Sequence, residues 1–163
     1  FLDDPNSFTP LLAERKLEFA ALAELQDPFI IDGVVPPLSD WKPRERSSDP
    51  VSVGEVLQGA GGSPGTVTGR ARVVLEPGDA RGLEEGEILV APVTDPSWTP
   101  LFIPAAGVVV DVGAPLSHAV IVSRELGVPC ACGVTGAALR IPDGALISVD
   151  GNTGAVTVVE LPA

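Results

Sequence analysis

The sequence predicts an α/β domain with a central mixed sheet and two or three short helices. Short segments rich in β-branched residues recur between residues 67 and 159, and turns of Gly, Pro and Asp separate them. Helical or turn-like segments alternate with these strands. An amphipathic helix and a proline-rich stretch come first, so we expect a compact domain that follows a helix and a linker.

The N-terminal region differs in composition from the rest. Residues 8–25 repeat apolar side chains at roughly the 3.6-residue period of an amphipathic helix. Residues 27–50 contain five prolines, which remove backbone donors and hold the chain extended, as in a semi-rigid linker. We therefore predict a helix and linker segment at residues 1–52 and a compact domain at residues 53–163.

The compact domain divides into strands and helices at its turn residues. We expect strands at residues 67–75, 87–92, 107–112, 130–134, 145–149 and 155–159, and helical or turn-like segments at residues 97–105, 117–126 and 135–139. A turn-rich connection joins the last two strands and predicts a terminal hairpin. The middle helix is best defined, because Ser117 is a suitable N-cap and Gly127 a suitable left-handed stop.

Composition excludes several classes of function. The net charge is −12, with 22 acidic and 10 basic residues, which argues against nucleic acid and anionic membranes as partners. No apolar run approaches the roughly 20 residues of a membrane span, and no leader pattern is present, so we expect a soluble, cytoplasmic protein. The chain contains no methionine, even at position 1, and we expect it to be a fragment of a longer protein.

The cysteines point to a packing role. Cys130 and Cys132 lie one residue apart in a predicted strand, which places both side chains on one face and makes a disulfide between them strained. We expect reduced thiols in the core. Two cysteines and one histidine fall short of the ligand set of a zinc site, so we predict no bound metal.

His118 is the one histidine of the chain and the strongest candidate for chemistry. A lone histidine is more commonly structural, but this one lies at the start of the predicted helix 117–126. Free backbone N–H groups and the helix dipole favour negative charge there. Imidazole is also nucleophilic near neutral pH, so His118 is suited to accept a phosphoryl group.

Residues 113–124, Gly-Ala-Pro-Leu-Ser-His-Ala-Val-Ile-Val-Ser-Arg, carry a resemblance to a known family. They resemble the phosphohistidine signature of the PEP-utilising enzymes. The likeness continues upstream at residues 62–65, 69 and 90–96 and downstream at residues 127–129, 143–144 and 149–151, in order along about two-thirds of the chain. The resemblance implies a swivelling β/β/α domain in which His118 carries a phosphoryl group between two active sites.

The same resemblance implies partners that this chain lacks. In such enzymes an ATP-grasp domain phosphorylates the histidine from ATP with Mg²⁺, or PEP serves as donor, and a separate domain binds the acceptor. We expect no cofactor in the fragment itself, since no glycine-rich phosphate loop followed by Lys and Ser or Thr is present. By itself the fragment is expected not to turn over.

Supporting roles follow for residues near His118. Ser117 either donates its hydroxyl to the phosphoryl oxygens or caps the helix. Arg124 belongs to the motif, but about 9 Å of helical rise separates it from His118, so we expect it to pin the helix to a neighbour.

We also assign candidate roles to three residues in predicted loops, Thr94, Asp95 and Gly113. Thr94 and Asp95 end a strand beside Trp98, where they either meet a partner domain or form an Asp-Pro turn with a packed tryptophan. Gly113 is expected to leave room for the phosphoryl donor.

Two alternatives remain. One is a non-catalytic swivelling or regulatory module that binds a partner through its glycine-rich surface. The other is the histidine domain of the first enzyme of a sugar phosphotransferase system. Leu116 stands where the dikinases usually have Thr, and it argues against a pyruvate phosphate dikinase. The resemblance implies instead a member of the family that is similar to PEP synthase or to rifampin phosphotransferase, where Leu tends to stand at this place. Together with the long N-terminal segment, Leu116 argues mildly against the sugar system.

Overall fold

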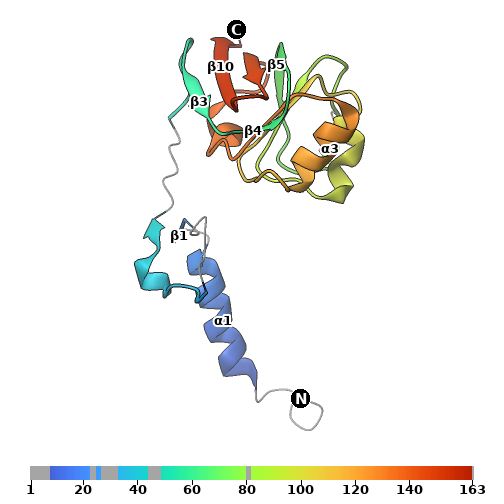
Figure 1. Cartoon of the computed structure of the whole chain (residues 1–163). Helices are drawn as coiled ribbons and strands as arrows, with labels where there is room; N and C mark the ends of the chain where they lie inside the picture. The colour runs from blue at the N-terminus through green and yellow to red at the C-terminus, as the bar shows by residue number, and fades with distance from the viewer. Residues whose placement is uncertain (1–7, 23–24, 27–32, 44–48, 80–81, 163) are drawn as a thin grey trace. The chain divides into compact units, whose positions relative to one another are not determined.

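The computed structural model describes residues 8–22, 25–26, 33–43, 49–79 and 82–162 (Figure 1). The chain divides into two compact units, residues 1–46 and 47–163. The sequence placed the boundary after residue 52, whereas Val51 is 2% exposed and its N–H donates to the carbonyl of Arg140 at 3.2 Å. Burial of this apolar side chain therefore attaches the last residues of the expected linker to the second unit.

The first unit contains the predicted N-terminal helix. Helix α1 spans Thr9–Leu22, and the structure gives it no buried residue. Strand β1 (Leu25–Gln26) pairs antiparallel with β2 (Lys42–Pro43), and the 3-10 helix η2 (Leu38–Asp40) lies between them in sequence. The parts of the expected linker at residues 27–32 and 44–48 lie outside the described residues.

The second unit is built on a mixed sheet, as predicted. Its strands are β3 (Val56–Gln58), β4 (Ala60–Ser63), β5 (Thr66–Val73), β6 (Ile88–Ala91), β7 (Gly107–Val110), β8 (Cys130–Cys132), β9 (Leu146–Asp150) and β10 (Ala155–Glu160). Their order is β3-β10-β9-β5-β6-β7-β8-β4. Strands β5 to β8 are parallel neighbours and the remaining pairs are antiparallel, including the predicted hairpin of β9 and β10.

Two strands of this sheet were missed by the sequence prediction, as were the short strands β1 and β2 of the first unit. Strand β4 reads Ala-Gly-Gly-Ser and has no β-branched residue, so strand propensity gives no signal there. Its glycines are needed for a close approach. A Cβ at Gly61 would stand 2.3 Å from the carbonyl oxygen of Asn152. Strand β3 is short and only Leu57 of its three residues is buried.

Alternate residues of the parallel strands enter two separate cores. One core packs Ile88, Val90 and Val109 against the antiparallel strands and the short helix α4 (Ala137–Arg140). The other packs Leu89 and Val108, from the opposite face, against the helices. Those helices are η3 (Pro96–Trp98), α2 (Thr99–Phe102) and α3 (His118–Leu126). The result is the expected β/β/α layering, with α3 on one side of the sheet (Figure 1).

The cysteine prediction is confirmed. Cys130 and Cys132 are free, fully buried and members of the same core beneath the helices, while Ala131 between them enters the other core. Burial raises the pKa of the Cys130 thiol to about 12, so this thiol stays protonated and unreactive. Among the helices that the structure describes, none has the length and apolar character needed to cross a membrane.

Candidate functional site

His118 is the first residue of α3 and is half-buried. Its Nδ1 lies 3.0 Å from the hydroxyl oxygen of Thr94, within hydrogen-bond distance. The ring of Phe102 meets the imidazole edge to face, with centroids 5.8 Å apart and the planes at 89°. Phe102 is itself fully buried, so a polar contact and an aromatic contact hold the imidazole in one orientation.

The parallel sheet brings these three side chains together. Thr94 follows the carboxyl end of β6, and His118 follows that of β7 after a longer loop. The pairing of β6 and β7 continues past their ends, because Asp111 N–H donates to Ala91 O at 3.1 Å and Val112 N–H donates to Pro92 O at 2.9 Å. Carboxyl ends of neighbouring parallel strands lie at one edge of the sheet, and ligand sites of such sheets form there.

The helix itself begins and ends as the sequence predicts. Ser117 has extended backbone angles, φ −72° and ψ 158°, and the first helical hydrogen bond runs from Ile121 N–H to Ser117 O at 3.0 Å. Gly127 closes the helix in the left-handed conformation with φ 70°. The N–H groups that precede the first helical bond point toward the end of the helix at which His118 lies.

The Ser117 side chain does not perform the capping role proposed for it. Its hydroxyl makes no hydrogen bond to the helix, and its Oγ is buried without a partner in the described structure. A Cβ placed on Gly113 would stand 3.2 Å from that oxygen, so the hydroxyl is directed inward, beside the loop. A buried hydroxyl without a partner costs free energy.

Arg124 joins the helix to its surroundings, as the sequence suggested. Its Nε donates to Gly62 O at 2.8 Å and its Nη1 donates to Pro115 O at 3.1 Å. One guanidinium thus connects α3, strand β4 and the loop that leads to His118. Arg124 holds the backbone around the histidine in place.

Asp95 and Trp98 form the turn that the sequence analysis described. Asp95 accepts hydrogen bonds from the backbone N–H and the hydroxyl of Ser97, at 2.8 and 2.6 Å. These bonds from Ser97, with a smaller contribution from the charge of His118, hold the pKa of the Asp95 carboxyl below its usual value. Trp98 is packed in the core beneath the helices with 4% exposure.

Gly113 lies close against the interior of the domain. A Cβ there would approach Cys132 Cβ at 3.0 Å and Val110 Cγ2 at 3.2 Å, both in the interior. The position therefore lets the loop after β7 lie close against the sheet, and the expectation that it also leaves room for the phosphoryl donor stays a prediction.

Two contacts of His118 escaped the sequence analysis. Thr94 was assigned a contact with a partner domain or a turn, and Phe102 was given no role. Finding Thr94 required the parallel order of β6 and β7, since loops after adjacent parallel strands meet at one edge, and the sequence carried no signal for that order. Phe102 gave no signal either, because a buried aromatic residue on a short helix is most simply read as core.

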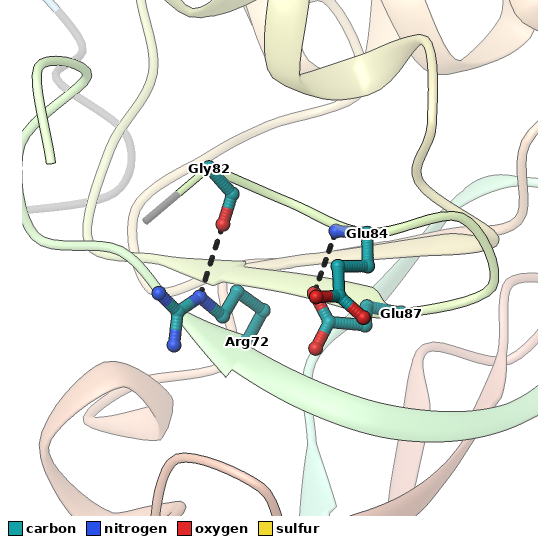
Figure 2. A pocket seen from close by; sticks show the side chains of 4 residues that line it. All are labelled: Arg72, Gly82, Glu84 and Glu87. Carbon is teal, nitrogen blue, oxygen red and sulfur yellow. Dashed lines mark hydrogen bonds between the residues drawn. The ribbon is translucent and has the colours of Figure 1, made fainter. Parts of the chain in front are cut away.

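A separate pocket lies at the other end of strand β6. It has a volume of about 160 Å³ and is lined by Arg72, Gly82, Glu84 and Glu87 (Figure 2). Arg72 Nε donates to Gly82 O at 3.1 Å, and its Nη1 forms an ion pair with Asp143 at 2.8 Å. Because Glu87 precedes β6 and Thr94 follows it, this pocket is not part of the His118 site.

Comparison with known sequences finds one matching family model and several similar proteins. The family model for the mobile domain of PEP-utilising enzymes matches residues 83–154. An uncharacterised protein of Mycobacterium tuberculosis is 41% identical over 157 residues, 96% of this chain and 18% of that protein. The rifampicin phosphotransferase of Streptomyces sviceus is 38% identical over 149 residues, 91% of this chain and 16% of that protein. A prodigiosin-synthesizing transferase of Serratia marcescens is 41% identical over 119 residues, 72% of this chain and 13% of that protein.

Two facts complete the comparison. The chain spans between 13% and 18% of the length of these relatives. Among solved structures, a chain from the holo form of Thermococcus kodakaraensis aconitase X has a TM-score of 0.51 and 18% identity, covering 66% of this chain and 100% of that chain. At this identity the likeness concerns the fold alone.

Proposed function

The chain belongs to the PEP-utilising enzyme family through its mobile domain, and from this premise we propose that it is a phosphohistidine carrier. His118 accepts a phosphoryl group at one active site and releases it at another. The observation that carries the proposal is the hydrogen-bond distance of 3.0 Å between Thr94 Oγ1 and His118 Nδ1. It supports a role for the other ring nitrogen, Nε2, as the reacting atom.

The tautomer matters for this chemistry. When Nδ1 carries the proton and donates it to the Thr94 oxygen, Nε2 keeps its lone pair and is nucleophilic. Within the described residues no hydrogen-bond partner lies at Nε2. The lone pair of Nε2 attacks the β-phosphorus of ATP, the N–P bond forms, and the P–O bond to the α-phosphate breaks with its electron pair leaving on AMP. Water then attacks the γ-phosphorus and the P–O bond between the β- and γ-phosphates breaks, which releases phosphate and leaves one phosphoryl group on Nε2.

Release reverses the same changes. An acceptor oxygen attacks the phosphorus, and the N–P bond breaks with its electron pair returning to Nε2. During both steps the Nδ1–H group of His118 remains hydrogen-bonded to the Thr94 oxygen. This hydrogen bond stabilises the positive charge that the phosphorylated ring shares between its nitrogens. The protein supplies orientation and electrostatics, as phosphoryl transfer requires.

The helix start supports a negatively charged product at His118. N–H groups ahead of the bond from Ile121 to Ser117 lie at the positive end of the α3 dipole. The Ser117 hydroxyl, buried without a partner in the described structure, reaches the phosphoryl oxygens after rotation about its Cα–Cβ bond. A phosphate held by backbone N–H groups and one hydroxyl needs no lysine or arginine beside it.

Donor and acceptor belong to the longer protein. The relatives are five to eight times longer than the matched region, as its 13–18% share of their length implies. In this proposal an ATP-grasp domain binds ATP with Mg²⁺ and phosphorylates His118, and a third domain presents the acceptor. The relatives that are named rifampicin phosphotransferase support a small-molecule acceptor.

The test uses the full-length protein and labelled donors. Separate incubations contain ATP labelled at the β position, ATP labelled at the γ position, and labelled PEP. We expect acid-labile, alkali-stable label on His118 from β-labelled ATP. His118→Asn, which keeps a polar side chain of similar size in the site, removes the label.

The other outcomes also have definite meanings. Stable label from γ-labelled ATP in place of β-labelled ATP means that Nε2 attacks the γ-phosphorus and that ADP leaves. Label from PEP alone assigns the donor role to PEP and removes the ATP-grasp step. Label that survives in His118→Asn, or no label from any donor, overturns the carrier function. Circular dichroism of the variant checks that the fold is retained.

A further inference from the structure

Large aliphatic side chains project into solvent beside the His118 site. They are Val93, Ile103, Leu116 and Ile121, with exposed fractions of 54%, 74%, 82% and 48%. Val93 adjoins Thr94 and Ile103 adjoins Phe102, the two residues that touch His118. Leu116 and Ile121 lie two positions before and three positions after the histidine. We call these four residues the apolar rim.

The surroundings of the apolar rim are also poor in charge. Residues 91–104 and 112–123 contain a single residue of the Asp, Glu, Lys and Arg types, Asp95, although these four types make up 20% of the whole chain. Exposed apolar residues combined with a depletion of charge are the compositional mark of the centre of a protein interface. Solitary exposed aliphatic residues need no explanation, but these four lie within three positions in sequence of His118 or next to the two residues that contact it.

The apolar rim is presented by segments that are already fixed. The loops after β6 and β7 are joined by the bond from Val112 N–H to Pro92 O at 2.9 Å. Arg124 ties the loop before His118 to strand β4 through Pro115 O and Gly62 O. A partner therefore meets a preorganised surface and orders little of it on binding.

We propose that the apolar rim is the surface with which this domain docks onto the phosphoryl-donor domain of the same longer protein. The inference rests on the carrier function and adds the residues of the docking surface. More than four-fifths of each relative's length lies outside the match to this chain. That length is enough for further domains in the same protein, and one of them is the partner in this proposal. Docking around His118 brings Nε2 to the donor phosphorus.

Charge explains why this surface is apolar. The chain carries a net charge of −12, and a donor site that holds a nucleoside triphosphate is itself rich in negative charge. Acidic side chains around His118 would repel the donor phosphates at the distances that transfer needs. Apolar contacts give affinity without this repulsion, and they exclude the water that would otherwise hydrolyse the N–P bond.

The first test compares two double variants of the full-length protein. Ile103→Ser with Leu116→Ser alters the apolar rim. Val53→Ser with Val56→Ser is the matched control, since these residues are 61% and 52% exposed and lie before and within β3. All four side chains are exposed, so we expect both proteins to fold with unchanged melting temperatures.

The rate at which His118 takes label from ATP decides the outcome. We expect the rim variant to be labelled about tenfold more slowly or worse, because a few side chains at the centre of an interface supply most of its binding energy. We expect the control to stay within about twofold of the parent. Equal rates in the two double variants would overturn the proposal. Both double variants keep His118, so this comparison tests the docking surface and not the identity of the phosphoryl acceptor.

A second test does not depend on phosphoryl chemistry. Leu116→Cys and Val53→Cys are placed separately in the full-length protein, and their reaction with a maleimide is followed by mass spectrometry of the peptide. Docking predicts that Cys at position 116 reacts much more slowly than Cys at position 53, despite the 82% exposure of Leu116 in this structure. This protection persists even if His118 proves not to carry phosphate.

Other occupants give other results. Equal reaction at the two positions means that the apolar rim is open in the longer protein, which contradicts the proposal. Protection that rises with protein concentration assigns the surface to a second copy of the protein. Protection that requires an added small-molecule acceptor makes the apolar rim part of the acceptor site. Either of the last two outcomes also overturns docking of the donor domain.

Discussion

The Thr94 hydroxyl lies 3.0 Å from Nδ1 of His118, and the two residues follow neighbouring parallel strands. Because of this contact, Nδ1 of the imidazole has a hydrogen-bond partner within the domain, and Nε2 is left for the phosphoryl group. Phe102 packs against the same imidazole at right angles, so rotation of the ring would break both contacts. Thr94 is thus a positioning residue for the proposed reaction at Nε2.

Replacing Thr94 by Val removes the hydroxyl and keeps the shape. We expect labelling of His118 in the full-length protein to slow about tenfold, since one hydrogen bond is worth roughly 1 kcal/mol and also selects the tautomer. Thr94→Ser should restore most of the rate. Nitrogen NMR shifts of the His118 ring should show a mixture of tautomers in Thr94→Val alone. A Val variant with the parent's rate and ring shifts would remove Thr94 from the mechanism.

The contrast between Thr94 and the strands shows what the sequence could predict. Strands β6 and β7 are continuous apolar runs buried on both faces, a pattern with a strong signal. The sequence also located His118 at a helix start, because Ser117 and Gly127 mark both ends of α3. These features depend on neighbours in sequence.

What escaped prediction depends on contacts between distant segments. The bond between Thr94 and His118 requires the order of the parallel strands, which one sequence does not reveal. Strand β4 forms from Gly-rich sequence because its backbone must pass close to Asn152 and Cys130. The loop at Gly113 packs so closely beside Cys132 that a Cβ at this position would face the interior. In each case tertiary packing overrides local propensity.

The Ser117 hydroxyl gives a prediction with two opposite effects. Ser117→Ala removes a buried oxygen that has no partner in the described structure. We expect the free energy of unfolding to rise by about 1 kcal/mol, because the cost of an unsatisfied group disappears. If Ser117 bonds the phosphoryl oxygens, the same variant should lose phosphohistidine faster. Urea denaturation measures the first effect and the decay of label measures the second.

A helix cap would behave differently. Loss of a capping hydroxyl costs about 1 kcal/mol, so a fall in stability of Ser117→Ala would mean that the hydroxyl caps α3 in solution. Ser117→Gly, which also lacks the hydroxyl, serves as the comparison for backbone effects.

We expect Arg124 to stabilise the domain through its two hydrogen bonds and not through its charge. Arg124→Ala leaves Gly62 O and Pro115 O without their donor, and we expect a loss of about 1 to 3 kcal/mol in the free energy of unfolding. Arg124→Lys keeps the charge but cannot make both bonds from one planar group, so it should recover less than half of the loss. Denaturant titrations of the parent and the two variants measure this. Full recovery by Lys would show that charge, and not geometry, is the contribution of Arg124.

Asp111 gives a prediction about pH. Its Oδ1 accepts the backbone N–H of Ala138 at 2.8 Å, and it follows β7 at the edge of the sheet. Burial raises the pKa of this carboxyl from 3.8 to about 6, against the opposing effect of backbone hydrogen bonds from residues 136–138. The folded state therefore holds a proton that the unfolded state has lost, between pH of about 4 and about 6.

The sign of the effect follows from this difference in bound protons. Where the folded state binds more protons, the free energy of unfolding falls as pH rises, so Asp111 lowers stability across the window from about pH 4 to about pH 6 and no further above it. Asp111→Asn cannot ionise and should lack this fall. The measurement is the urea midpoint of both proteins at several pH values, taken as a difference so that the contributions of Asp95, Asp150 and Glu55, whose pKa values are lowered, cancel. A difference that stays constant from pH 4 to pH 6.5 would show that the Asp111 carboxyl is ionised in the folded domain throughout, and that its hydrogen bonds to the start of α4 outweigh its burial.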